Sequence, residues 1–203
     1  MKRFLMVLST LALSACGSPP AYNYTLSPPV LTQTAAVVPA KTGPYSLAEV
    51  TVPAEADHTS LVIQQADGRV LMLADDLWTA PLSAHLQTAL SLELTTLLGM
   101  PPVQNLSSGV RDESEVTRIQ VDVQRFDLVP GKFVAIQAQW RIRFAGKPAK
   151  TLTCFTSLQQ PVGVGVSALV TGQQANTQKL SALIAQSLIQ RASPANAQCT
   201  SNV

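Results

Sequence analysis

The sequence predicts a single α/β domain, in which a mixed, largely antiparallel β-sheet packs against two main α-helices. Two observations support this prediction. In several segments apolar and polar residues alternate, which is the period of a half-buried strand. In residues 81–98 and 172–191 the apolar residues recur instead at the spacing of one helix face. The predicted order is three strands, a helix, three strands and a helix, as in a sheet covered by helices. At 203 residues the chain is long enough for about one domain.

Residues 1–15 have the layout of an export signal. Lys2 and Arg3 give a positive start, and residues 4–13 form a mostly apolar run. This run is too short to cross a bilayer core of about 30 Å, which requires about 20 residues. We therefore expect a signal peptide at residues 1–15, cleaved before Cys16.

The residues before Cys16, Leu13-Ser14-Ala15, resemble the lipobox of bacterial lipoproteins, in which the cysteine sulfur carries diacylglycerol. The resemblance implies that Cys16 is a lipidation site and that the mature chain is held at a membrane by several acyl chains. One acyl chain alone would bind only reversibly. Gly17 stands where lipoproteins retained in the inner membrane often carry Asp, which implies the outer membrane, facing the periplasm. The alternative is a buried cysteine that happens to follow an apolar run.

The composition of the mature chain excludes one class of partner. Cleavage removes Lys2 and Arg3, and the remaining basic residues then equal the 12 acidic ones. A neutral chain lacks the strongly basic face that nucleic acids require, so we expect no nucleic-acid partner. Charged residues make up only 13% of the sequence, about half the usual share. This low share favours a protein that covers part of its surface in an assembly.

Residues 16–44 are rich in Pro, Ala, Thr and Ser and are interpreted as a lipidated N-terminus followed by a flexible spacer. Within them, residues 22–26 have a strand-like pattern and could pair with the sheet. The folded domain is predicted at residues 45–203.

The first group of strands is predicted at residues 45–52, 60–65 and 69–74, and Asp67-Gly68 indicates a hairpin between the last two. The helix over residues 81–98 follows. Thr79 is its expected N-cap and Gly99 suits the position after its last turn. Its apolar stripe consists of Leu82, Leu86, Leu90, Leu94 and Leu97. Asp75 and Asp76 precede this helix, and we interpret them as acids that cap it or interact with its positive end. A catalytic carboxylate pair is the other interpretation.

Three adjacent alternating segments, at residues 119–128, 134–144 and 152–158, predict an antiparallel meander with one buried face. The apolar phase shifts near Arg125, as a β-bulge would cause. The structure of residues 162–170 is ambiguous from the sequence. The second helix is predicted over residues 172–191, with Leu180, Leu183, Ile184, Ser187 and Leu188 on one side, and residues 193–203 form a tail.

Two cysteines remain once Cys16 carries lipid. Because the periplasm is oxidising, Cys154 and Cys199 favour a disulfide that ties the tail to the sheet. Two free buried thiols are the alternative.

The search for catalytic or metal-binding residues finds little. His58 and His85 belong to a loop and to the first helix, and packing or solvation explains His85 better than catalysis. Residues 165–169 match a nucleophile elbow at Ser167 except at Leu169, where glycine is required. No cluster has metal-ligand spacing, so we expect no metal and no cofactor.

One local cluster, Trp78-Thr79-Ala80-Pro81-Leu82, places a tryptophan between a strand end and a helix start. One interpretation is a tryptophan that packs under the corner. The other is a candidate interface formed by Trp78, Pro81 and Leu82, since tryptophan is enriched where partners dock.

Taken in order, the motifs resemble the PqiC (paraquat-inducible protein C) family of ABC-type transport auxiliary lipoproteins. The residues that carry the resemblance run through most of the mature chain: Cys16, Tyr24-Thr25-Leu26, residues 50–53, Arg69-Val70-Leu71, Trp78 to Leu82, residues 94–99, residues 121–127 and Ala138-Gln139-Trp140. Leu77 departs from the family, which often has a basic residue before the tryptophan.

The resemblance implies a non-enzymatic subunit at the outer membrane. Such a subunit works with a tube-forming protein of mammalian-cell-entry (MCE) domains in lipid transport between two membranes. It also implies a homo-oligomeric ring that docks the end of the tube. Two other hypotheses stay open: a lipoprotein that shuttles lipid in an apolar cavity between helix and sheet, and an esterase that uses Ser167.

Overall fold

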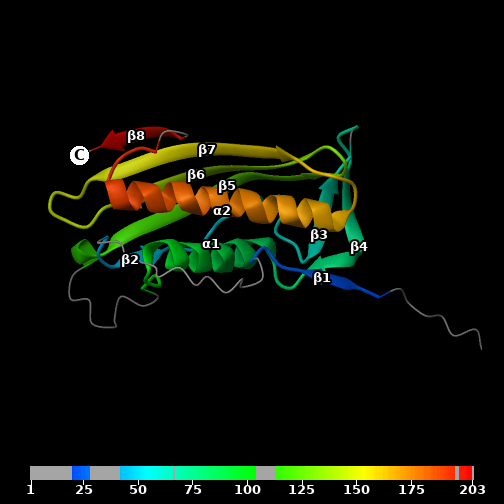
Figure 1. Cartoon of the computed structure of the whole chain (residues 1–203), viewed down its shortest axis with the longest axis horizontal. Helices are drawn as coiled ribbons and strands as arrows, with labels where there is room; N and C mark the ends of the chain where they lie inside the picture. The colour runs from blue at the N-terminus through cyan, green and yellow to red at the C-terminus, as the bar shows by residue number, and fades with distance from the viewer. Residues whose placement is uncertain (1–19, 28–41, 66, 104–112, 195–196, 203) are drawn as a thin grey trace, which may run out of the picture.

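The computed structural model describes residues 20–27, 42–65, 67–103, 113–194 and 197–202. In this part of the chain, eight strands form two mixed sheets, and two long helices cover the larger one (Figure 1). The predicted α/β class is therefore confirmed. The strands are β1 (Tyr22–Tyr24), β2 (Tyr45–Leu47), β3 (Ser60–Gln64), β4 (Val70–Trp78), β5 (Thr117–Val129), β6 (Phe133–Arg143), β7 (Thr151–Pro161) and β8 (Gln198–Asn202). The helices are α1 (Leu82–Leu98), the short 3-10 helix η1 (Glu113–Glu115) and α2 (Val166–Gln190).

The larger sheet has the strand order β2-β5-β6-β7-β8. Strands β5 to β8 are antiparallel neighbours, and β2 is parallel to β5 at the edge. The predicted meander is confirmed, together with its bulge, since the β5–β6 register shifts between Val123 and Arg125. The bulge lets the apolar face of β5 continue although the sequence pattern changes phase there.

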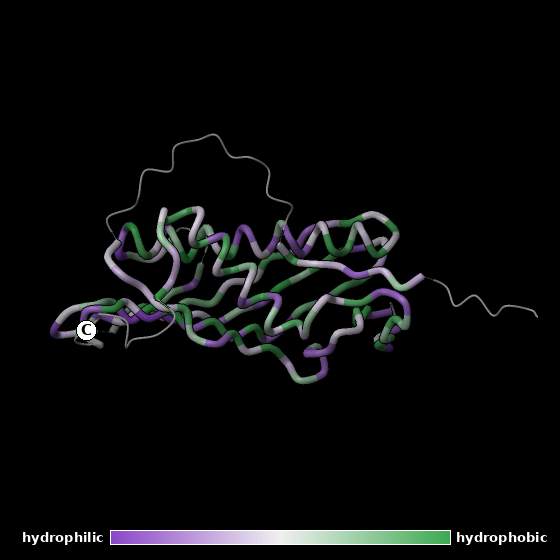
Figure 2. The backbone as a smooth tube through the Cα atoms, turned by 90° about the horizontal axis from the view of Figure 1, so that it is seen from below, coloured by the Kyte–Doolittle hydropathy of each residue, from purple (hydrophilic) through white to green (hydrophobic). Residues whose placement is uncertain are grey.

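One face of this sheet is buried beneath the helices. Along β5, β6 and β7, buried apolar side chains that face the helices alternate with polar side chains that face away. Figure 2 colours the backbone by the hydropathy of each residue. Helices α1 and α2 lie side by side on that face and contact each other. The largest buried side chain is Trp140, whose indole N–H donates to the Thr156 hydroxyl at 2.9 Å. No helix of the described chain covers the opposite, polar face.

The second sheet, in the order β1-β4-β3, crosses one end of the molecule (Figure 1). The hairpin predicted at Asp67-Gly68 joins β3 and β4, and Gly68 adopts the positive φ of 86° that its turn requires. Strand β4 continues past residue 74 to Trp78, because its last residues pair in parallel with β1. The single sheet predicted from the sequence is thus divided in two.

The strand predicted at residues 45–52 is shorter than expected. Strand β2 ends at Leu47, and only an isolated bridge from Thr51 to Asp122 continues it. The reason is a contact with α1: the Val50 N–H donates to Gln87 Oε1 at 2.9 Å, where a strand would need a backbone partner.

Helix α1 has the predicted extent, and Gly99 ends it in the left-handed conformation, with its N–H donating to the Thr95 carbonyl. The expected N-cap is wrong. Pro81 occupies that position, and the carboxylate of Asp57, from the loop before β3, accepts the Ser83 N–H at 2.9 Å. The predicted stripe also errs at its end, since Leu98 is buried and Leu97 is 40% exposed.

Helix α2 begins at Val166 and so includes residues 166–170 of the segment whose structure the sequence left open, while residues 162–165 form the connection from β7. Gly172, expected at the helix start, lies inside it. A β-carbon there would come within 2.6 Å of Val134 Cγ2 and 2.7 Å of Val162 Cγ1, so α2 approaches β6 closely at this point. The next residue, Gln173, is buried and donates to the Asp127 and Ala135 carbonyls.

Both ends of the described chain are tied into the fold. Strand β1 takes residues of the predicted spacer into the small sheet, and Leu26 just after it is 1% exposed. The predicted tail forms β8, which pairs with β7. The predicted signal peptide and Cys16 lie outside the described residues.

Candidate functional site

The predicted disulfide is present. Cys154 of β7 and Cys199 of β8 are bonded to each other and face one another in the strand register. Cys154 is 1% exposed, so the bond is part of the core. It holds the last strand of the chain against the sheet.

The candidate interface at Trp78 is mostly buried. The Trp78 side chain is 3% exposed and its ring lies 5.8 Å from the His85 ring and 6.4 Å, edge-on, from that of Phe126. Leu82 is 1% exposed, whereas Pro81 is on the surface. Trp78 therefore packs under the strand–helix corner, as one of the two interpretations held, and an interface role for the three residues stays a prediction.

His85 closes this corner from the first turn of α1. Its Nε2 lies 2.8 Å from the Thr79 hydroxyl and accepts the Ala80 N–H at 3.1 Å, so the neutral ring satisfies a backbone donor before the helix begins. Desolvation by burial lowers the pKa of His85 below its ordinary value of 6.5. The residue has the packing role expected from the sequence.

His85 makes stability depend on pH. Because its pKa is lower in the folded than in the unfolded chain, the unfolded state takes up the proton first as the pH falls below 6.5. We expect the melting temperature to fall as the pH drops through 6.5 toward the lowered folded-state value. The His85→Gln variant, which keeps an acceptor and does not titrate, should lose this part of the pH dependence in calorimetric melts. An unchanged pH profile in that variant would assign the effect to another group.

Asp75 and Asp76 do not act at the helix end, since both belong to β4. Asp76 accepts a hydrogen bond from the Tyr24 hydroxyl at 2.9 Å, which joins β1 to β4. Partial burial and the neighbouring carboxylate of Asp76 raise the pKa of Tyr24, while the Ser167 hydroxyl opposes the shift.

Within the described residues, Ser167 contacts this tyrosine, and no imidazole is hydrogen-bonded to it. The esterase hypothesis requires such a base, and the local geometry offers it no support.

Across the described residues, His, Cys, Asp and Glu side chains do not gather in threes as a metal site would require. Neither α1 nor α2 is long and apolar enough to cross a membrane.

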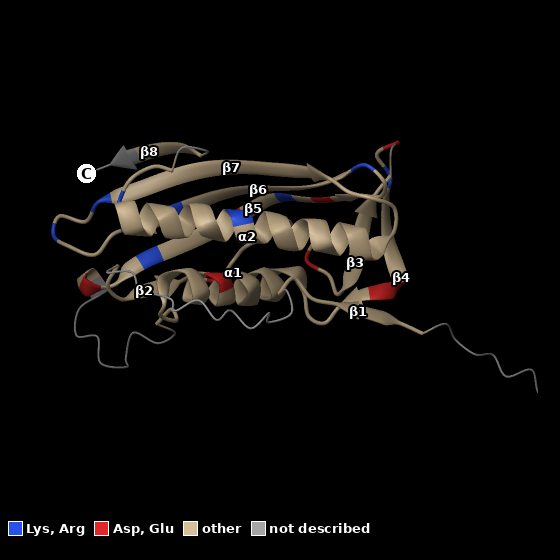
Figure 3. Ribbon diagram, viewed as in Figure 1, with Lys and Arg blue, Asp and Glu red and all other residues tan. Residues whose placement is uncertain are grey.

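A concavity of about 650 Å³ opens on the uncovered face of the larger sheet. We call it the basic concavity, and its lining residues are Ser46, Leu47, Ala48, Val103, Arg118, Gln120, Arg141, Arg143, Thr151 and Thr153. Arg118 and Arg143 are direct cross-strand neighbours, and Arg141 lies two residues along β6 on the same face. Three arginines from two neighbouring strands therefore line one concavity. Figure 3 shows that Lys and Arg gather at this end of the sheet, near the β6–β7 turn.

A second, apolar groove of about 230 Å³ lies between the two helices. Leu97 of α1 and Ala182, Ala185 and Ile189 of α2 line it, with Ile189 54% exposed. The shuttle hypothesis needs a cavity between helix and sheet, whereas this groove is on the outer side of the helix pair.

The basic concavity was not predicted from the sequence. Arg118, Arg141 and Arg143 occupy outward positions of alternating strands, which the pattern does show. These arginines lie together only in the observed β5–β6 register. The bulge near Arg125 shifts that register, so the alternation of residues alone does not specify it.

Fold and surfaces together define the class of protein: an α/β domain of two mixed sheets and two helices, with a basic concavity on its open sheet face. Residues 24–185 match the family described as the ABC-type transport auxiliary lipoprotein component, and the chain belongs to this family. The resemblance seen in the sequence is thereby confirmed. The family is not known for enzymatic activity, and its description associates it with ABC-type transport.

Two solved structures have a similar fold. One, described only as an uncharacterized protein, aligns with a TM-score of 0.66 at 20% identity, over 84% of this chain and 99% of that one. The other is protein XCC0632 from Xanthomonas campestris, with a TM-score of 0.57 at 13% identity, over 85% and 94% of the two chains. At these identities the likeness shows the fold alone. No functionally curated protein matches the chain.

Proposed function

We propose that the chain is a periplasm-facing lipoprotein subunit of an intermembrane lipid transport system that contains an MCE-domain tube and an ABC-type transporter. In this role it is anchored through Cys16 and docks or scaffolds the tube at the outer membrane. Its membership of the transport auxiliary lipoprotein family supports the transport and lipoprotein parts of the proposal. The docking role rests on the surface of the domain.

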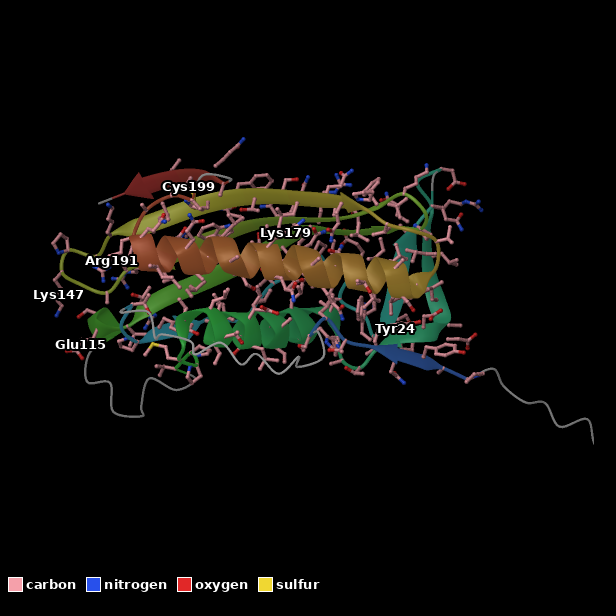
Figure 4. All side chains as sticks on the ribbon, viewed as in Figure 1. Tyr24, Glu115, Lys147, Lys179, Arg191 and Cys199 are labelled. Carbon is pink, nitrogen blue, oxygen red and sulfur yellow. A yellow bond between two sulfur atoms is a disulfide. The ribbon has the colours of Figure 1, made fainter. Side chains whose placement is uncertain are left out.

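The observation that carries the docking role is the position of the basic concavity. It lies on the one large sheet face that neither α1 nor α2 covers, toward the end of the molecule where Lys147 and Arg191 are labelled in Figure 4. Tyr24, beside the N-terminal attachment, is labelled at the other end. A partner that approaches from the side away from the anchor therefore meets the basic end.

Charge at this end favours an acidic surface on the partner. The side chains of Arg141 and Arg143 are both exposed, and the Arg141 guanidinium donates to a neutral group, the Thr153 hydroxyl, at 3.4 Å. Opposite charge on a docking partner would speed association and fix its orientation.

The apolar groove between α1 and α2 is proposed as a contact between copies of the chain. Exposed Leu97 and Ile189 lie at its rim, and a chain with only 13% charged residues is suited to lateral neighbours. A homo-oligomer formed in this way leaves the basic concavity open.

Charge reversal tests the docking role. We expect Arg141→Glu or Arg143→Glu to weaken binding of the MCE-domain protein about tenfold, because each would place like charges across the interface. Binding is measured by biolayer interferometry at two salt concentrations. The matched control is Lys179→Glu, because Lys179 is an exposed residue of α2. If all three variants bind like the parent chain, the concavity is not the docking surface. If the parent chain itself binds no MCE-domain protein, the proposed partner is wrong.

A further inference from the structure

The N-terminal attachment constrains where the domain can lie. Only residues 17–21 separate Cys16 from Tyr22, the first residue of β1. Even fully extended, this connection spans about 20 Å. If Cys16 carries the lipid, as the proposed function holds, Tyr22 at the start of the small sheet is kept within that distance of the bilayer.

The same end of the molecule exposes a run of apolar side chains. Val70, Leu71 and Met72 are consecutive in β4, and they are 61%, 45% and 51% exposed. They pair with β3, but β1 reaches only the other end of β4, at residues 76–78. Because side chains alternate along a strand, three exposed neighbours mean that both faces of this ribbon are uncovered. Scattered exposed apolar residues are ordinary, whereas such a run indicates a contact surface.

Further apolar side chains belong to this end. Tyr22 of β1 is 58% exposed, and Val164, in the turn before α2, is 87% exposed. The N-terminal part of α2 lies beside the end of β1, because the Gln174 side-chain amide donates to the Thr25 carbonyl at 2.9 Å. In Figure 1 the β3–β4 hairpin, β1 and the start of α2 are all at one end of the molecule.

We propose that Tyr22, Val70, Leu71, Met72 and Val164 form a membrane-contacting surface that rests in the interfacial layer of the bilayer that holds Cys16. The short connection selects the bilayer as the occupant, because it holds this end of the molecule beside the membrane. Tyr22 stays within about 20 Å of Cys16, and Val70 is six residues, about another 20 Å of strand, from the β4 residue that pairs with Tyr22. Half-exposed aliphatic residues with a tyrosine match the chemistry of that layer. The helices then extend away from the membrane, and the basic concavity faces the periplasmic partner.

Brominated lipid tests the contact directly. In the chain 16–203, which retains every described residue, the Cys154–Cys199 bond leaves Cys16 as the free thiol. Cys16 is coupled to a maleimide phospholipid in phosphatidylcholine vesicles, with or without brominated acyl chains. Tryptophan is introduced as Met72→Trp, or as Leu92→Trp for the control. The control site has a similar exposure of 53%, is about 15 Å of helix from the start of α1, and belongs to neither proposed contact surface.

We expect the added fluorescence of Met72→Trp to shift to shorter wavelength on coupling and to be quenched by brominated lipid. Leu92→Trp should show neither change. The buried Trp78 and Trp140 supply a constant background that the parent chain measures. Val164→Trp repeats the test away from the hairpin, should Met72→Trp fail to fold.

Two results would overturn the proposal. One is a Met72→Trp signal that brominated lipid leaves unquenched. The other is a shift that appears without vesicles and grows with protein concentration, which would assign the surface to a second copy of the chain. Because the coupling is chemical, the outcome does not depend on acylation in cells. Metabolic labelling of Cys16 with a fatty acid tests that separately, and a negative result there would count against the anchored role alone.

Discussion

Replacing both bonded cysteines, Cys154→Ala with Cys199→Ala, is expected to lower the free energy of unfolding by about 4 kcal/mol. The bond closes a loop between residues 45 positions apart, and that value is the loop-closure entropy it removes from the unfolded chain. Strand β8 pairs only with β7, so without the bond five residues at the chain end have few other contacts to hold them. Urea unfolding, followed by the fluorescence of Trp140 opposite Cys154, measures the change.

The matched control for this experiment is Cys16→Ala, which removes a cysteine and leaves the bond in place. Its urea midpoint should equal that of the parent chain. A double variant as stable as the parent would mean that the bond contributes nothing to the stability of the folded state, contrary to the loop it closes and to the burial of Cys154.

The second large effect is expected at Trp78. Trp78→Ala should cost about 3–5 kcal/mol of stability, because it opens a cavity between β4, α1 and β5 where His85 and Phe126 now contact the indole. Trp78→Phe should cost less, since it keeps an aromatic ring in the same place. Thermal and urea unfolding of the two variants give the difference.

This experiment also separates the two interpretations of the corner. A packing role predicts loss of stability, whereas an interface role predicts a stable domain that binds its partner poorly. Pro81→Ala, on the exposed part of the same corner, is the control for the interface role. A Trp78→Ala chain of unchanged stability that no longer binds the MCE-domain protein would reverse the assignment.

The sequence was most informative where short-range patterns decide the structure. The meander β5–β6–β7 has one buried face, so the alternation of Ile119, Val121 and Val123 and its shift at Arg125 predict both strand and bulge. Helix α1 was predictable because its leucine stripe faces the core and Gly99 ends it. The disulfide followed from the number of cysteines and the expected compartment.

The sequence was least informative where distant residues meet. The small sheet depends on a parallel pairing of Tyr22–Tyr24 with the end of β4, and no local pattern specifies that. Asp57 stabilises the start of α1 from a loop some distance along the chain. Helix α2 was predicted too short because its buried side includes Gly172 and Gln173, which a search for apolar residues at helical spacing does not count.

Strand β8 has a consequence for the order in which the protein is made. Residues 198–202 follow β7 and α2 in the chain, so synthesis from the N-terminus completes β7 before β8 exists. Until they arrive, the outer edge of β7 has unpaired backbone groups that can pair with another chain. Nascent or truncated chains that end before Gln198 are therefore prone to edge-to-edge association. Synthesis of β8 is the step that protects this edge, and the Cys154–Cys199 bond then holds the strand in place.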